Sequence, residues 1–92
     1  MATFESVCER MYTMFRACGF PGIGGIADAG DEWVFIEAPT VKGGEIPLGD
    51  KPVFVNKQTG ETRLMEFDIP DLKKLNHAVE ILVPAPYLPR YS

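Results

Sequence analysis

The chain has 92 residues, of which 46% are hydrophobic and 24% are charged, and its formal net charge at pH 7 is −4. This length suits one domain with a single core, because a second domain would have too little interior to be stable, and the composition excludes a disordered chain. The acidic balance argues against nucleic-acid binding, which relies on Lys and Arg contacts to phosphates, and no run approaches the ~20 apolar residues that a membrane-spanning helix needs.

The segment 1–19 predicts a long amphipathic helix. Its apolar residues recur every three or four positions, the spacing of one helical face. They are Phe4, Val7, Cys8, Met11, Met14, Phe15 and Cys18. Thr3 is the expected N-cap, and Gly19 suits the left-handed position after the last turn. Glu5 and Glu9 stand where a signal peptide would be basic, so we expect no export signal and a cytoplasmic location.

The glycine-rich stretch that follows includes Gly22-Ile23-Gly24, which resembles part of a phosphate-binding loop. Such a loop needs a strand before it and a helix after it, so that the helix N-terminus faces the phosphate. Here a helix precedes and a strand follows. We therefore interpret the stretch as a flexible connector that could include a short, irregular edge strand at Ile23–Ala27.

The segment 33–67 predicts a sheet that contains a hairpin. Trp33–Ala38 is rich in aromatic and β-branched residues, as strands are. Two further strand-like runs, Val53–Lys57 and Glu61–Phe67, enclose a short loop in which Gly60 suits the left-handed position of a type I turn with a bulge. The hairpin is therefore predicted as scaffold.

Alternation along these strands assigns their side chains to two faces. Val53, Val55 and Leu64 fall on the face opposite to Phe54. Neither face is cleanly polar, and one long helix covers only one side of a small sheet. The C-terminal segment, a second copy of the chain or another protein could cover the other side.

The segment 68–83 predicts a short helix and a last strand. Asp68 or Asp71 would cap the helix, and Leu72 and Leu75 would face inward. The resulting fold class is α+β, with the long N-terminal helix packed on a roughly four-stranded antiparallel sheet and the short helix before the last strand.

The Pro-rich segment 84–92 predicts an extended tail. It could fold back on the sheet or reach a neighbouring molecule.

The acidic residues gather in one part of the chain. Between Gly22 and Asp50 there are six acids and one base, a net charge of −5. This segment is either a solvated loop or a docking patch for a basic partner, and its Trp33 is either a core residue or an interface residue. The candidate partner-binding residues are Asp28, Asp31, Glu32, Trp33 and Glu37.

The chain offers little catalytic chemistry. Cys8 and Cys18 lie about 15 Å apart on one helix, too far for a disulfide, and both fall on the predicted core face as buried free thiols. With His77 as the one histidine, clustered zinc or iron ligands are missing. We therefore predict no catalytic residue, no metal site, no cofactor and no enzymatic activity.

The segment from Trp33 to Leu64 resembles the YrhB-like small immunity proteins of bacterial polymorphic toxin systems. These have an aromatic strand followed by a hairpin with a G-[N/D]-x-P start and a T-G-x turn. The matching residues here are Trp33, Phe35, Gly49, Asp50, Pro52, Val53, Val55, Asn56, Lys57, Thr59, Gly60 and Glu61. The resemblance implies a cytoplasmic, non-enzymatic protein that protects its host by binding a cognate toxin.

The function predicted from the sequence is therefore protein binding, with a basic toxin domain as the expected partner and no nucleic acid or membrane. The alternative is a homo-oligomeric structural or small-ligand-binding module, for which a homodimer is the simplest form. A small enzyme that uses His77 or the acidic cluster is the third hypothesis.

Overall fold

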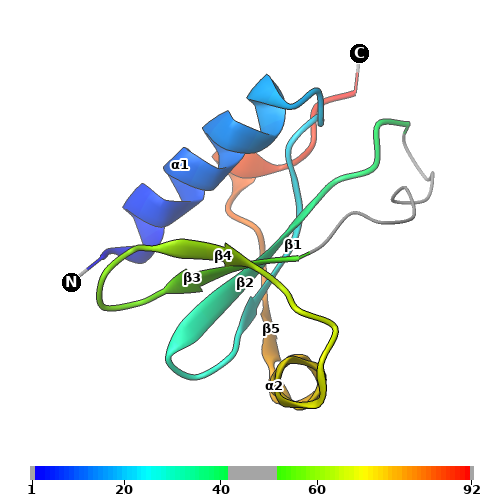
Figure 1. Ribbon diagram of the computed structural model, residues 1–92. Coiled ribbons are helices and arrows are strands. Elements are labelled where there is room, and N and C mark those ends of the chain that lie inside the picture. The colour runs from blue at the N-terminus through cyan, green and yellow to red at the C-terminus, as the bar shows by residue number, and fades with distance from the viewer. Residues whose placement is uncertain (1, 42–51, 92) are drawn as a thin grey trace.

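A five-stranded antiparallel sheet carries one helix on each face, as the computed structural model of residues 2–41 and 52–91 shows (Figure 1). The elements are α1 (Phe4–Ala17), β1 (Ile23–Asp28), β2 (Glu32–Glu37), β3 (Val53–Asn56), β4 (Thr62–Leu64), α2 (Ile69–His77), β5 (Val79–Ile81) and a 3₁₀ turn, η1 (Ala85–Tyr87). The strand order is β4-β3-β2-β1-β5. The predicted α+β class is confirmed, and the sheet has one strand more than expected. No helix in residues 2–41 or 52–91 is both long and apolar enough to span a bilayer.

Helix α1 begins and ends as its sequence predicts. The Thr3 hydroxyl accepts a hydrogen bond from the Ser6 backbone N–H at 3.2 Å, and Gly19 follows the helix with a φ of 94°. The prediction for the second cysteine was wrong. Cys8 is buried, but Cys18 is the C-cap residue and is exposed, because the backbone leaves the helical path where the apolar stripe would have continued.

Strand β1 lies inside the sheet, between β2 and β5. The expected irregular edge strand is thus an interior one. A Cβ on Gly22 would lie 2.8 Å from the Cα of Pro89, and a Cβ on Gly24 would lie 2.8 Å from the Cα of Ala38. These two glycines are therefore needed for close backbone approach, and this explains the Gly-x-Gly pattern without a phosphate.

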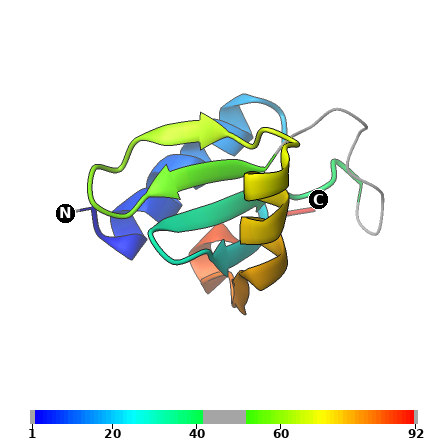
Figure 2. The ribbon, with the colours of Figure 1, turned by 60° about the horizontal axis from the view of Figure 1, so that its bottom comes forward.

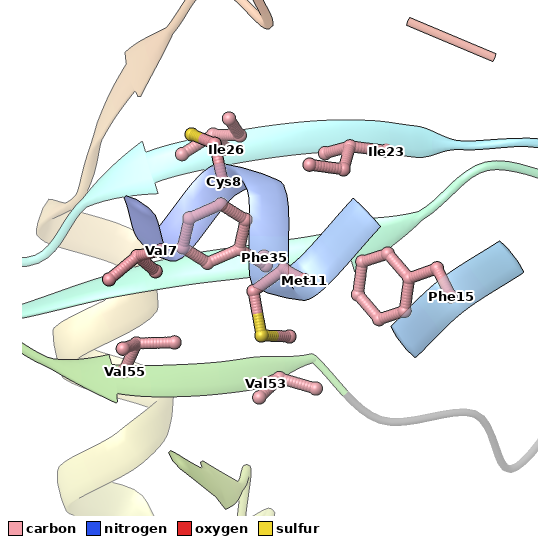
Figure 3. Packing of buried hydrophobic residues seen from close by; sticks show 9 residues of the cluster. All are labelled: Val7, Cys8, Met11, Phe15, Ile23, Ile26, Phe35, Val53 and Val55. Carbon is pink, nitrogen blue, oxygen red and sulfur yellow. The ribbon is translucent and has the colours of Figure 1, made fainter. Parts of the chain in front are cut away.

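The main core lies between α1 and the sheet (Figure 3). Its buried members are Val7, Cys8, Met11, Phe15, Ile23, Ile26, Phe35, Val53 and Val55. The C-terminal tail packs against the same core within the chain. The rings of Tyr12 and Tyr87 lie 5.7 Å apart, and the Arg90 N–H donates to the Pro21 carbonyl at 3.1 Å. The tail is not fully extended, because η1 interrupts it.

The hairpin forms as predicted, and Gly60 has the predicted left-handed conformation, with a φ of 76°. The Gly60 N–H donates to the Asn56 carbonyl four residues back, so the turn is one residue longer than the expected type I turn. Its second strand, β4, is shorter than predicted. In the register, Phe54 pairs with Arg63, and Val53 pairs with Leu64. The predicted faces are confirmed, since Val53 and Val55 face α1 and Phe54 faces the opposite side.

Helix α2 covers part of the face opposite to α1 (Figure 2). There Leu75 packs against a small cluster of Val34, Phe54 and Met65. The prediction that Leu72 faces inward was wrong, because Leu72 is exposed and Asp71 takes the buried position. The sheet face that the sequence leaves open is therefore covered in part by the chain's own second helix.

Candidate functional site

Four charged side chains meet between α2 and the sheet, and we call this group the α2 charge cluster: Glu32, Arg63, Asp71 and Lys74. Arg63 is its centre, and the hairpin register points it to the α2 side of the sheet, next to Phe54. Its Nε and Nη2 atoms donate to the Glu32 carboxylate at 3.0 and 2.9 Å. Its Nη1 and Nη2 atoms donate to the Asp71 carboxylate at 2.9 and 3.0 Å. One guanidinium thus binds two carboxylates in the paired geometry that suits arginine.

Lys74 extends the cluster to the turn between β1 and β2. Its ammonium group donates to Glu32 and forms an ion pair with Asp31 at 2.7 Å. Asp71 is also fixed by the backbone, because its carboxylate accepts the Glu66 N–H at 2.8 Å. Helix α2 is therefore tied to β2, to β4 and to the turn by charged contacts.

The cluster also covers apolar surface. The Arg63 guanidinium lies 4.4 Å from the centroid of the Phe54 ring, and the Lys74 ammonium lies 5.9 Å from it. At such distances a cation is attracted to the face of an aromatic ring. Phe54 itself is fully buried, so the cations and Leu75 together shield the small core under α2.

The protonation states of the cluster are strongly fixed. Hydrogen bonds, first to Asp71 and then to Glu32, raise the pKa of Arg63. Burial alone would raise the pKa of Glu32, but hydrogen bonds from Arg63 and Lys74 outweigh burial and lower it. The hydrogen bond from Arg63 lowers the pKa of Asp71, and that from Lys74 lowers the pKa of Asp31. All these groups stay charged near neutral pH, so the cluster suits structural clamping and not proton transfer.

The five candidate partner-binding residues are divided among separate places. Asp31 and Glu32 both form ion pairs with Lys74. Asp28 forms an ion pair with Lys57 at 2.7 Å, and the hydrogen bond from Lys57 lowers its pKa.

The other two candidates are more enclosed. Trp33 packs edge-on against Phe4, with 5.4 Å between ring centroids, and is partly buried. Glu37 is buried at the other end of β2. Of the acidic candidates, Asp31 has the side chain most open to solvent, at 78% exposed.

Three members of the cluster were missed from the sequence: Arg63, Asp71 and Lys74. Two signals for them exist. The alternation that assigns Phe54 to one face also assigns Arg63 to it, and Asp71 and Lys74 have the three-residue spacing of neighbours on a helix. The second signal, the spacing of Asp71 and Lys74, conflicts with the usual preference for leucines on the inner face of a helix.

The outer side of α2 carries two apolar residues beside the polar residues Lys73, Asn76 and His77. Ile69 is 69% exposed and Leu72 is 42% exposed, whereas Asp71 is only 6% exposed. Just before the helix, Phe67 is also 60% exposed. The usual arrangement of a surface helix has its apolar residues inward and its charges outward, so α2 is partly inverted.

A groove of about 550 Å³ lies on the other side of the molecule, between α1 and the hairpin. It is lined by Arg10, Met11, Met14, Thr59, Gly60, Glu61 and Thr62. Arg10 crosses it to donate to the Gly60 carbonyl. In the described part of the chain no three His, Cys, Asp or Glu side chains gather as metal ligands would, and His77 lies exposed at the end of α2.

Comparison of the chain with protein-family models, curated proteins and solved structures finds no match. The similarity of the Trp33–Leu64 segment to the YrhB-like immunity proteins therefore stays a prediction.

Proposed function

We propose that this protein is a non-catalytic binding module whose partner is another protein, and that the partner docks on the outer side of α2. The observation that carries the proposal is the inversion of this helix. Ile69 and Leu72 are turned to solvent, while Asp71 and Lys74 are turned to the sheet. Exposed apolar side chains grouped on one element are a feature of interaction surfaces.

The charge cluster supplies a physical reason for the inversion. Asp71 and Lys74 have fixed partners in Arg63, Glu32 and Asp31. Turning α2 over would break these contacts, so that Arg63 would lose Asp71 and buried Glu32 would lose Lys74. Breaking a buried ion pair is costly, because the remaining charge has lost its water. The clamp therefore holds the apolar residues outward, as a protein-binding helix requires.

The partner we propose is a toxin domain that this protein neutralises by direct binding, as the Trp33–Leu64 resemblance implies. Asp31, whose side chain is largely exposed next to α2, would meet a basic group at the rim of the contact.

A cytoplasmic location fits the exposed free thiol of Cys18, because exposed free thiols persist in reducing compartments.

Affinity capture with matched variants tests this proposal. The tagged protein, Leu72→Glu and Asn76→Glu would each be used on extracts of the native cells, and bound proteins would be identified by mass spectrometry. Both substitutions place a glutamate at an exposed position of α2, so only the loss of an apolar contact distinguishes them. We expect one stoichiometric partner with the wild type and Asn76→Glu, and its loss with Leu72→Glu.

The captured partner then allows the toxin step to be tested. We expect its expression alone to stop cell growth and co-expression of this chain to restore it. A partner that is harmless alone would overturn the immunity function but leave protein binding in place. Self-association without a partner, measured by sedimentation, would favour the homo-oligomeric module instead.

A further inference from the structure

Strand β4 leaves one backbone edge without a neighbour among the described residues, since it ends the strand order. The Asn56 N–H donates to the Glu61 carbonyl and the Met65 N–H donates to the Pro52 carbonyl. Antiparallel pairing alternates, so residues 61, 63 and 65 direct their backbone groups to β3. Thr62 and Leu64 therefore direct their N–H and C=O groups away from the sheet.

The open edge has a defined length. The next outward-directed N–H belongs to Glu66, and the Asp71 carboxylate accepts it at 2.8 Å. At the other end, the edge stops at the turn, where the Gly60 N–H donates to the Asn56 carbonyl at 2.8 Å. The edge available for pairing is thus Thr62–Leu64, which is the whole of β4.

Apolar side chains and a groove lie next to this edge. The register puts the side chains of Thr62 and Leu64 on the same side of the sheet as Val53 and Val55, which is the side of α1. Leu64 is 58% exposed, and Met14 of α1 is 39% exposed and lines the groove together with Thr62. An added strand would direct every second side chain to this side of the sheet, beside the groove.

We propose that β4 is a strand-addition site, at which an extended segment of the partner pairs with Thr62–Leu64 and places alternate apolar side chains in the groove between α1 and the hairpin. The backbone supplies the hydrogen bonds and the groove supplies the side-chain selectivity. This proposal rests on the proposed protein-binding function and adds the mode of recognition. The chain runs from β4 through residues 65–68 into α2 (Figure 2), so the two surfaces belong to neighbouring elements on opposite sides of the sheet.

A partner segment fits the edge better than a second copy of this chain does. In-register pairing of two β4 strands would put Arg63 directly opposite the Arg63 of the other copy, and like charges at that position are destabilising. A partner segment has no such restriction. The groove wall includes both Arg10 and Glu61, so we expect its selectivity to come from apolar anchors and not from one sign of charge.

The test uses Leu64→Pro, with Leu64→Ala as its matched control. Both remove the leucine side chain, but only proline also removes the outward N–H, while the ladder bonds to β3 stay intact. The probe is a displayed library of random short peptides, selected on the wild-type protein. We expect selected peptides to carry apolar residues at alternate positions and to bind Leu64→Pro about tenfold more weakly than Leu64→Ala.

Hydrogen exchange on the wild-type protein provides a readout that does not depend on variant folding. The selected peptide should slow exchange of the Thr62 and Leu64 amides, whereas the Arg63 amide, already bonded to β3, should be slow with or without it. Exchange at Thr62 and Leu64 that the peptide leaves unchanged would overturn the proposal, as would failure to select any peptide.

Two further outcomes separate this proposal from the proposed function. A peptide whose binding is lost in Leu72→Glu but equal in Leu64→Pro and Leu64→Ala docks on α2, which overturns strand addition and leaves protein binding standing. A dimer of the wild type that Leu64→Pro dissociates and Leu64→Ala does not would identify a second copy as the occupant and overturn the partner segment. If the peptide binds Leu64→Pro more weakly than Leu64→Ala, and Leu72→Glu still captures the partner, strand addition at β4 is supported and docking on α2 is overturned.

Discussion

Replacing Arg63 by methionine should destabilise the protein strongly, because Arg63 is the centre of the α2 charge cluster. Methionine keeps an apolar stem of similar length over the Phe54 ring but supplies no hydrogen-bond donor. Glu32, whose side chain is 8% exposed, would lose both bonds to the guanidinium and keep only Lys74. Asp71 would lose its cation altogether.

The magnitude follows from how these charges are placed. Removing one partner of a buried ion pair costs about 3–5 kcal/mol. Arg63 is 41% exposed and Lys74 still neutralises Glu32, so the loss should fall below that range, and we expect about 2–3 kcal/mol. With an unfolding entropy of roughly 2.1 cal/mol/K per residue, this corresponds to a fall in Tm of roughly 10–15 °C.

Urea denaturation followed by circular dichroism measures this loss, and a double-mutant cycle assigns it. Glu32→Gln, Arg63→Met and the double variant would be compared with the wild type. The double variant removes Glu32, one of the two carboxylates that Arg63→Met deprives of the guanidinium, so the two losses should add to more than the loss in the double variant. We expect a coupling of about 1–2 kcal/mol.

A loss of less than about 0.5 kcal/mol in Arg63→Met, the range of an ordinary surface ion pair, would show that Arg63 does not clamp α2. Two single losses that simply add in the double variant would show the same. In either case another contact would hold α2, and the charge cluster would not be what keeps Ile69 and Leu72 facing solvent.

Three other predictions concern the pH dependence, the glycines and the thiols. The pKa of Glu32 lies below its ordinary value of 4.5, so its stabilising charge should be complete above about pH 5 and lost as the pH falls further; urea midpoints should fall less steeply in Glu32→Gln. Gly22→Ala should cost about 1–3 kcal/mol by forcing the tail away, whereas Gly25→Ala, where a Cβ meets open space, should stay within about 0.5 kcal/mol of the wild type by thermal denaturation. Burial raises the pKa of the Cys8 thiol to about 11, so a thiol reagent should label Cys18 alone in the folded protein, and rapid labelling of both would contradict the packing of α1.

The sequence by itself determined the features that depend on local chemistry. The stripe of α1 and its cap at Thr3 follow from helical spacing and from one side chain bonding its own first turn. The hairpin follows from alternation and from Gly60, whose φ of 76° few other residues adopt. The assignment of Phe54 to the face opposite to Val53 and Val55 also held, because the period of a strand is fixed by its backbone.

Only the tertiary structure decided which side of α2 faces the sheet and which strand lies at the edge. The contacts of Arg63 with Glu32 span 31 residues, and those of Lys74 with Glu32 span 42. Such pairs depend on how the strands are ordered, and the strand order places β4 at the end and β1 inside. Local propensity favours leucines on the buried side of a helix, but here the contacts of a partly exposed guanidinium with two buried carboxylates outweigh that preference. The exposure of Ile69 and Leu72 on α2 and the open edge of β4 therefore follow from long-range charge pairing and strand order, neither of which the spacing of residues along the chain encodes.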